Sequence, residues 1–266
     1  MGIPSISAQI CAFQVESGAR VWYNSAITAE RVMTMGNEQR RLELFCGRRP
    51  DAPLVMLMAG PDEGRTVWEA ARAETDADFA LAAFQDLAWN DDLSPWPMPP
   101  LEKGEEGFGG GAKRFLGWLT DRALPQIIAA LGGTPAYTAV AGYSLGGLFA
   151  LYALSACDAF DRAASASGSL WYPDFVDYAR KHPPRRMPAC VYLSVGNRER
   201  RAQYTVMRCV EDETRRMAAW YREIGAPVML EINPGGHFKE PERRMGRAVA
   251  RMLEGPSGFY FGRELD

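Results

Sequence analysis

The sequence predicts an α/β fold, built on a mainly parallel central sheet with helices on both faces. Short apolar segments typical of strands alternate with longer segments whose apolar residues recur at helical spacing. This alternation indicates parallel strands, because each parallel pair needs a crossover connection that is usually a helix. We interpret residues 1–266 as a single domain, in which residues 1–50 supply strands at the N-terminal edge of the sheet.

Strands are expected where short apolar runs are bounded by polar or turn-forming residues. The predicted strands are residues 11–16, 21–26, 41–46, 53–59, 79–87, 136–141, 163–167, 190–195 and 228–232. The run PLVMLMA at 53–59 is continuously apolar, which indicates a strand covered on both faces. The first strands precede the alternating part of the chain and are compatible with antiparallel pairing.

Helices are expected where the apolar spacing changes to three or four residues. The predicted helices are residues 66–73, 112–131, 144–156, 204–224 and 242–253. Pro125 should kink the helix over 112–131, because proline lacks the N–H of an interior helical bond. The helix over 144–156 is apolar on nearly all sides, which predicts a core helix, and Gly147 is expected to allow close packing on a neighbour.

The composition excludes several classes of protein. The net charge is −3, so nothing indicates a nucleic-acid partner, and no apolar run approaches the ~18 residues of a membrane span. The N-terminus lacks a basic segment followed by an apolar stretch, so no secretory signal is predicted.

The five cysteines are widely spaced and form no CxxC pair. They indicate free, mostly buried thiols in a reducing compartment, and therefore a cytoplasmic protein, although one of them could be a nucleophile. With only two histidines in the chain, no metal site is expected.

The segment Gly142-Tyr143-Ser144-Leu145-Gly146 lies where a predicted strand changes into a predicted helix. A serine between two glycines at such a seam is typical of a nucleophile elbow. The turn is so tight that side chains at the glycine positions would collide, and the helix that follows directs its free N–H groups toward a developing oxyanion. The short pattern also occurs by chance, but this context favours Ser144 as a nucleophile.

His237 is the predicted general base, because a serine hydroxyl needs a base in order to attack. It lies in the loop PGGHF after the last predicted strand, and α/β-hydrolases have the chain order serine, acid, histidine. The alternative, His182, lies in the polar stretch KHPP, which is typical of an exposed connector.

Glu199 is the predicted acid, since it is the first carboxylate after the strand CVYLSV. It would hold the imidazole tautomer and stabilise the imidazolium. Three alternatives stay open: Glu199 could simply pair with its flanking arginines, Glu211 or Asp212 could be the acid, or a Ser–His pair could act without a strong acid.

The predicted oxyanion hole has two backbone donors. The first is the N–H of Leu145, the residue after the nucleophile. The second should come from Gly60-Pro61-Asp62-Glu63, after the strand over 53–59. Pro61 has no N–H, so a neighbour must donate, and Asp62 is the residue we predict.

Several further stretches accompany the elbow. They are Asp92-Leu93-Ser94-Pro95, Gly109-Gly110-Gly111 with Phe115-Leu116 and Pro125-Gln126-Ile127, residues 141–150, residues 167–172, Gly196-x-x-Glu199 and Gly236-His237. Together they resemble the esterase group of α/β-hydrolases that includes the bacterial enterochelin (enterobactin) esterases and relatives of S-formylglutathione hydrolase. The resemblance covers about residues 50–254 and is closest over 141–150.

This resemblance implies an α/β-hydrolase fold and ester hydrolysis, with Ser144 as nucleophile, Glu199 as acid and His237 as base. One departure concerns the oxyanion hole. The family often has Asp-Gly and then a residue with an N–H after its third strand, whereas this chain has Ala59-Gly60-Pro61.

Three residues are predicted to bind substrate. Trp171 and Tyr172 follow a strand end and could line an acyl or aromatic pocket, or pack in the core. Arg198, with Arg200 and Arg201, could meet an anionic substrate such as a catecholate siderophore, or form a solvated face. Residues 107–112 fit G-x-G-x-x-A, but no strand precedes them, so we expect a mobile loop near the active site rather than a dinucleotide site.

The sequence therefore predicts a serine esterase that hydrolyses a small-molecule carboxylic ester, siderophore-type esters included, and that needs no cofactor. The alternatives are an acyltransferase on the same elbow and a non-catalytic binding module. The natural ester and the oligomeric state, a homo-oligomer included, stay open.

Overall fold

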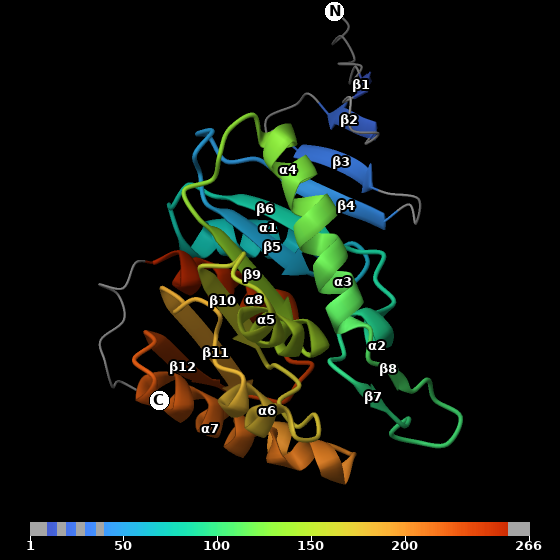
Figure 1. The fold of residues 1–266 in the computed structure, drawn as a ribbon, viewed down its shortest axis with the longest axis vertical. Coiled ribbons are helices and arrows are strands. Elements are labelled where there is room, and N and C mark those ends of the chain that lie inside the picture. The colour runs from blue at the N-terminus through green and yellow to red at the C-terminus, as the bar shows by residue number, and fades with distance from the viewer. Residues whose placement is uncertain (1–9, 15–19, 25–29, 36–39, 255–266) are drawn as a thin grey trace, which may run out of the picture.

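A 10-stranded sheet runs through the molecule in the order β1-β2-β3-β4-β6-β5-β9-β10-β11-β12 (Figure 1). The computed structural model describes residues 10–14, 20–24, 30–35 and 40–254, with side chains from residue 40 onward. The strands of the sheet are β1 (Ile10–Gln14), β2 (Arg20–Asn24), β3 (Glu30–Met35), β4 (Arg40–Phe45), β5 (Leu54–Met58), β6 (Ala80–Phe84), β9 (Thr138–Tyr143), β10 (Arg162–Ala166), β11 (Cys190–Gly196) and β12 (Val228–Asn233).

The sheet has an antiparallel and a parallel part. β1 to β4 pair antiparallel, and β4 joins the parallel part by antiparallel pairing with β6. From β6 through β5 and β9 to β12, all neighbours are parallel. The antiparallel pairing with which the first predicted strands were compatible is therefore present, although β3 was not among the predicted strands. The predicted strands over 11–16 and 21–26 extend at their ends beyond the described residues.

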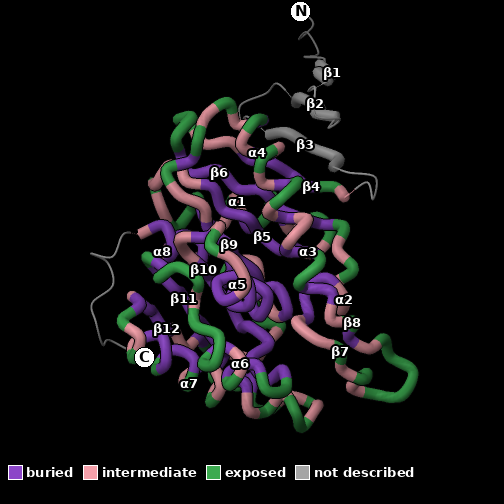
Figure 2. The backbone as a smooth tube through the Cα atoms, in the orientation of Figure 1, coloured by how far each residue is buried: buried purple, intermediate pink, exposed green. Residues whose placement is uncertain are grey.

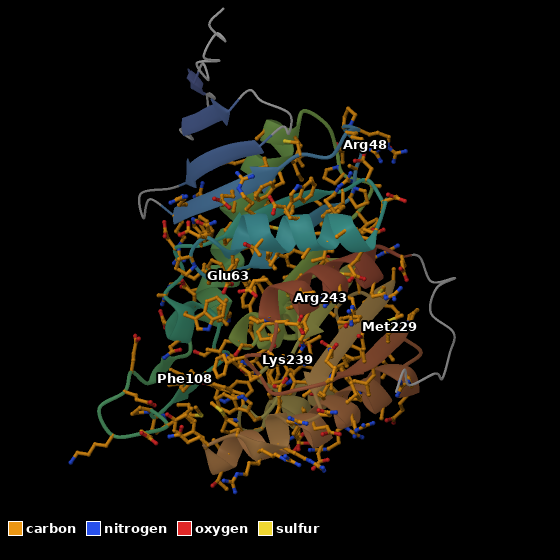
Figure 3. All side chains as sticks on the ribbon, turned by 180° about the vertical axis from the view of Figure 1, so that it is seen from behind. Arg48, Glu63, Phe108, Met229, Lys239 and Arg243 are labelled. Atoms are coloured by element: carbon orange, nitrogen blue, oxygen red, sulfur yellow. The ribbon has the colours of Figure 1, made fainter. Side chains whose placement is uncertain are left out.

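Helices cover both faces of the sheet, which confirms the predicted fold class. They are α1 (Glu63–Glu74), α2 (Trp89–Asp92), α3 (Ala112–Trp118), α4 (Leu124–Leu131), α5 (Leu145–Ala156), α6 (Phe175–Lys181), α7 (Val210–Glu223) and α8 (Pro241–Leu253). α1 and α8 lie side by side on one face, which Figure 3 shows from behind. α3 to α7 pack on the other face.

The two apolar layers explain why the central strands are apolar throughout. In β5, Met56 packs into the layer of α3 to α7, whereas its neighbour Leu57 packs into the layer of α1 and α8. α5 is buried from Leu145 to Ser155 (Figure 2), so the expectation of a core helix is confirmed. A Cβ on Gly147 would lie 2.8 Å from the Ser165 hydroxyl oxygen, so this glycine does allow close packing on β10.

Two predicted helices differ from the structure. The segment over 112–131 is α3 and α4 joined by a π-helical turn, Leu119–Ala123, and Pro125 lies in the first turn of α4. The missing N–H of proline is tolerated in a first turn, and the chain changes its winding just before Pro125. The helix expected over 204–224 begins only at Val210, after a 3-10 helix, Thr205–Cys209.

The glycine-rich segment 107–112 includes β8 (Phe108–Gly109), which pairs with β7 (Pro97–Met98) in a hairpin absent from the prediction. Gly111 donates its N–H to the Asp91 carbonyl at 2.8 Å. A Cβ on Gly109 or Gly111 would collide with the Asp91 carboxylate. Close approach to α2 therefore accounts for these glycines.

Among the described cysteine side chains, Cys190 is buried and Cys46, Cys157 and Cys209 are half-buried, and none of these four forms a disulfide. Burial raises the pKa of Cys190 to about 12, so its thiol stays protonated. In the described ranges, no helix has the length and apolarity that crossing a bilayer requires.

Candidate active site

Ser144 occupies a strained turn between β9 and α5. Its φ of 54° and ψ of −122° lie in a region that non-glycine residues rarely adopt. A Cβ on Gly142 would lie 2.3 Å from the carbonyl carbon of Gly146, so no larger residue fits there. The local sequence thus builds the sharp turn that presents the Ser144 side chain at the carboxyl end of the sheet.

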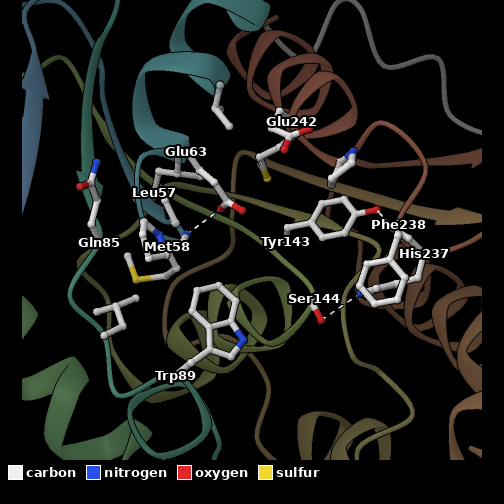
Figure 4. A pocket seen from close by; sticks show the side chains of 17 residues that line it. Leu57, Met58, Glu63, Gln85, Trp89, Tyr143, Ser144, His237, Phe238 and Glu242 are labelled. Carbon is white, nitrogen blue, oxygen red and sulfur yellow. Dashed lines mark hydrogen bonds between the residues drawn. The ribbon is translucent and has the colours of Figure 1, made fainter.

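The structure brings Ser144, His237 and Glu199 into one hydrogen-bonded chain. Ser144 Oγ lies 3.1 Å from His237 Nε2 (Figure 4). On the other side of the ring, His237 Nδ1 lies 2.9 Å from Glu199 Oε2. A carboxylate can only accept, so Nδ1 carries the proton and leaves Nε2 free to accept from the serine hydroxyl. The three residues follow β9, β12 and β11, whose carboxyl ends meet at one edge because the strands are parallel.

Glu199 is only 4% exposed, and hydrogen-bond donors surround its carboxylate. Its Oε1 accepts from the Gly196 N–H and from the Ser167 hydroxyl, each at 2.7 Å, and lies 3.2 Å from Arg244 Nη2. Burial alone would raise the pKa of Glu199. The bonds from His237, Ser167 and Gly196 outweigh burial and hold its pKa below the ordinary value, so the acid is ionised at neutral pH.

The loop that carries His237 is fixed through its backbone. The Tyr143 hydroxyl donates to the His237 carbonyl at 2.6 Å, and Arg244 Nη1 donates to the Gly236 carbonyl at 3.3 Å. Burial raises the pKa of Tyr143 to about 12, which keeps its hydroxyl protonated as a donor. These bonds fix the backbone position from which the imidazole reaches Ser144.

Ser169 is a contact of Ser144 that the sequence did not single out. Its hydroxyl lies 3.2 Å from Ser144 Oγ, and its N–H donates to the Ser144 carbonyl at 3.0 Å. If Ser144 donates its proton to His237, Ser169 can donate to the same Ser144 oxygen and fix its rotamer.

The structure does not bring Asp62 to the site. Asp62 is exposed, precedes α1 with a φ of 59°, and does not line the cavity at Ser144, whereas Gly60 and Glu63 do. The Gly60 N–H donates to Glu63 Oε2 at 2.6 Å. Gly60 lines the cavity and is therefore the candidate backbone donor of this loop. Its N–H already binds the Glu63 carboxylate. Leu145, the other predicted donor, is the first residue of α5, so its N–H has no partner within the helix.

Two cavities meet at Ser144, and His237 and the 90% exposed Phe238 line both. We name them the Trp89 cavity, of about 390 Å³, and the Trp171 cavity, of about 460 Å³. The Trp89 cavity is lined by Leu57, Trp89 and Met245, with the carboxylates of Glu63 and Glu242 (Figure 4). The Trp171 cavity is lined by Trp171, Met207 and Tyr204, with Arg198 and Arg201.

Two of the three residues predicted to bind substrate line a cavity at Ser144, and the third does not. Trp171 and Arg198 line the Trp171 cavity. Tyr172 lines neither cavity at Ser144: it is buried against Trp96 and Phe108, and its hydroxyl donates to the Trp96 carbonyl at 2.6 Å. Core packing therefore explains Tyr172.

The alternatives for base and acid lie elsewhere. His182 is exposed at the end of α6, where its ring stacks on Tyr178. Glu211 pairs with Arg215 within α7, and Asp212 is exposed. Within residues 40–254, no group of three or more His, Cys, Asp or Glu side chains is placed to hold a metal ion.

Solved structures share this fold. An IroE-like serine hydrolase from Shewanella oneidensis superposes with a TM-score of 0.70 at 17% identity, over 84% of this chain and 79% of that one. The siderophore hydrolase EstA from Aspergillus nidulans gives 0.66 at 18%, over 85% and 94%. The enterobactin esterase FES from Shigella flexneri gives 0.56 at 18%, over 89% of this chain and 59% of that one.

No curated protein matches the sequence. A family described as Putative esterase matches residues 90–225, which is more than half of the chain and includes Ser144 and Glu199. The α/β-hydrolase fold and this match agree with the resemblance of the motifs. The chain belongs to this esterase family.

Proposed function

We propose that the protein hydrolyses carboxylic esters as a serine hydrolase, with Ser144 as nucleophile, His237 as general base and Glu199 as the acid that orients it. The hydrogen-bond chain from carboxylate through imidazole to hydroxyl carries this proposal, with distances of 2.9 and 3.1 Å. Both distances fall within the about 2.6–3.2 Å over which such groups exchange a proton.

In the first half of the reaction, His237 Nε2 takes the proton from Ser144 Oγ while Oγ bonds to the ester carbonyl carbon. Glu199 stays ionised and stabilises the imidazolium. The imidazolium then gives its proton to the departing alcohol oxygen as the bond from that oxygen to the carbonyl carbon breaks. The acyl group remains on Ser144.

In the second half, His237 takes a proton from a water molecule, whose oxygen attacks the acyl carbon. The imidazolium then returns that proton to Ser144 Oγ as the acid leaves. The balance is one ester and one water in, one acid and one alcohol out, with no cofactor.

The negative charge that develops on the carbonyl oxygen needs donors in place. Leu145 N–H follows from its position after Ser144. We assign the second donor to Gly60 N–H in place of Asp62, since Gly60 lines the Trp89 cavity and Asp62 does not. This assignment requires the Glu63 carboxylate to leave the Gly60 N–H when the substrate binds.

The two cavities support an ester with a sizeable group on each side of the scissile bond, since Ser144 lies where they meet. The Trp89 cavity suits an apolar or aromatic group. Arg198 and Arg201 give the Trp171 cavity donors for an anionic or phenolic group. A siderophore-type ester combines these features, and two of the similar structures are named a siderophore hydrolase and an enterobactin esterase.

Hydrolysis of p-nitrophenyl esters by the wild type and by Ser144→Ala tests the proposal. We expect kcat to fall by at least about 10³-fold in the variant. Equal rates would refute it. A panel that includes iron-free and ferric siderophores then sorts substrates by kcat/KM, and preferential transfer to an added alcohol would indicate an acyltransferase instead.

A further inference from the structure

A buried arginine contacts the Glu199 carboxylate oxygen that does not face His237. Arg244 lies in the first turn of α8 and is only 5% exposed. Its Nη2 lies 3.2 Å from Glu199 Oε1 and also donates to Ser167 Oγ, while Nη1 donates to the Gly236 carbonyl. One guanidinium thus contacts the chain just beyond β10, β11 and β12.

Burying this ion pair is costly unless its hydrogen-bonding groups find partners. Glu199 Oε1 receives bonds from Ser167 and Gly196 in addition to the contact with Arg244. Ser167 bridges the pair with its hydroxyl and has a φ of 44°, a strained conformation for a serine. The strained residue and the buried charges converge on one carboxylate, the one that holds His237.

The contacts use the planar fork of arginine rather than its charge alone. Nη2 reaches the acid and Nη1 reaches the loop of the base, so the side chain fixes the distance between these two segments. The guanidinium carbon also lies 5.5 Å from the ring centre of Tyr143, whose hydroxyl holds the His237 carbonyl. A lysine could supply the charge but could not make both contacts.

We propose that Arg244 is a positioning residue of the site. It neutralises the buried Glu199 carboxylate and holds this carboxylate in a fixed position relative to the loop that carries His237. This role rests on the proposed function, because it acts only through Glu199 and His237. Arg244 lines neither cavity at Ser144 and so does not touch the substrate.

The charge has a consequence for pH. Without Arg244, the Glu199 carboxylate would be less neutralised and would favour the protonated imidazole, which cannot act as a base. The acid limb of the rate profile should then move to higher pH. Among the described residues, the other titratable or charged groups that contact these residues or line the same cavities are Tyr143, Tyr204, Glu63, Glu242, Arg198 and Arg201.

The test compares Arg244→Gln and Arg244→Lys with Arg243→Gln. Arg243 is the neighbouring residue on α8 (Figure 3), is exposed, and pairs only with Glu240 among the described residues. Each variant is checked for folding by circular dichroism. kcat and KM for a p-nitrophenyl ester are then measured across pH, with and without millimolar guanidinium chloride.

We expect Arg244→Gln to lower kcat by about 10- to 100-fold with little change in KM, because a misplaced catalytic group costs rate rather than binding. Its acid limb should move to higher pH, and guanidinium should restore part of the rate. Arg244→Lys should lose kcat but keep the wild-type acid limb, and Arg243→Gln should match the wild type.

A folded Arg244→Gln with unchanged kcat would overturn the proposal. So would a reduced kcat with an unmoved acid limb and no rescue, since a purely structural role predicts that pattern. If Arg244→Gln does not fold, a wild-type kcat in Arg244→Lys overturns it. Ser144→Ala, run in parallel, separates this failure from failure of the serine mechanism itself.

Discussion

Two parts of the site serve one proposed reaction but are built in opposite ways. They are the elbow at Ser144 and the group formed by Glu199, His237 and Arg244, which we call the support. The elbow depends on residues within one turn, since a Cβ on Gly142 would collide with Gly146. The support joins a carboxylate after β11, an imidazole after β12 and a guanidinium on α8. The difference shows that steric constraints within one turn can position a nucleophile. Activating that nucleophile requires side chains from several strands and a helix that meet at the carboxyl edge of the sheet.

The largest expected effect comes from removing the base. His237→Gln should lower kcat by about 10⁴-fold or more, because Ser144 would lose its proton acceptor. His182→Gln is the matched control, since it alters the other histidine, which is exposed at the C-terminal end of α6. An ester hydrolysis assay on both variants gives the ratio of their kcat values. Similar activities for the two would mean that the support does not activate Ser144.

The elbow can be broken on its own. Gly142→Ala should lower the free energy of unfolding by about 3 kcal/mol, because the new methyl group overlaps backbone that cannot move aside. Gly117→Ala in α3 is the control: its Cβ meets no atom within 4 Å, and alanine favours a helix by about 1 kcal/mol. Urea denaturation measures both. A Gly142→Ala protein as stable as the wild type would show that the turn is not sterically constrained.

The support has a pH signature of its own. The pKa of Glu199 is lowered in the folded protein, so its contribution to stability is present above about pH 4.3, the value for an unfolded glutamate, and is lost as the pH falls through the folded pKa. Between the unfolded and the folded pKa of Glu199, the unfolded state binds more protons than the folded state. One such group changes the unfolding free energy by up to about 1.4 kcal/mol per pH unit.

Denaturation between about pH 5 and 2 should therefore give a shallower pH dependence for Glu199→Gln than for the wild type. Glu211→Gln, which alters a carboxylate paired within α7, serves as the comparison. Equal slopes for Glu199→Gln and the wild type would indicate that Glu199 is not held in its ionised form.

The smallest effect concerns the edge of the Trp89 cavity. In Glu63→Gln, the amide should hold the Gly60 N–H less strongly than the carboxylate does, and the variant removes a negative charge near the developing oxyanion. We expect kcat to rise about 2- to 5-fold, which corresponds to less than about 1 kcal/mol. Glu69→Gln, at an exposed position of the same helix, should leave kcat unchanged. A fall in kcat for Glu63→Gln alone would show that the carboxylate assists catalysis.

The sequence was most informative where the physical cause is local. The apolar run of β5, the elbow glycines and the apolar α5 each reflect packing or sterics within a few residues, and each was predicted. Chain order was enough to nominate His237 and Glu199, because the carboxyl ends of parallel strands must meet.

The sequence was least informative where contacts join distant segments. Arg244 is one of several arginines in a helix, and only the fold places it on Glu199, 45 positions away in the chain. Ser169 and Glu63 likewise matter because of the residues they contact in the fold, Ser144 and Gly60, and no sequence motif singles them out. Asp62 was nominated because Pro61 cannot donate, but the turn into α1 directs Gly60, not Asp62, to the cavity.

Covalent labelling tests the central claim most directly. A fluorophosphonate probe phosphonylates a serine hydroxyl only where a base activates it. Intact mass and peptide mapping should show one adduct on Ser144 of the wild type, none in Ser144→Ala and strongly slowed labelling in His237→Gln. An unlabelled wild type, or an adduct on another residue, would contradict the account.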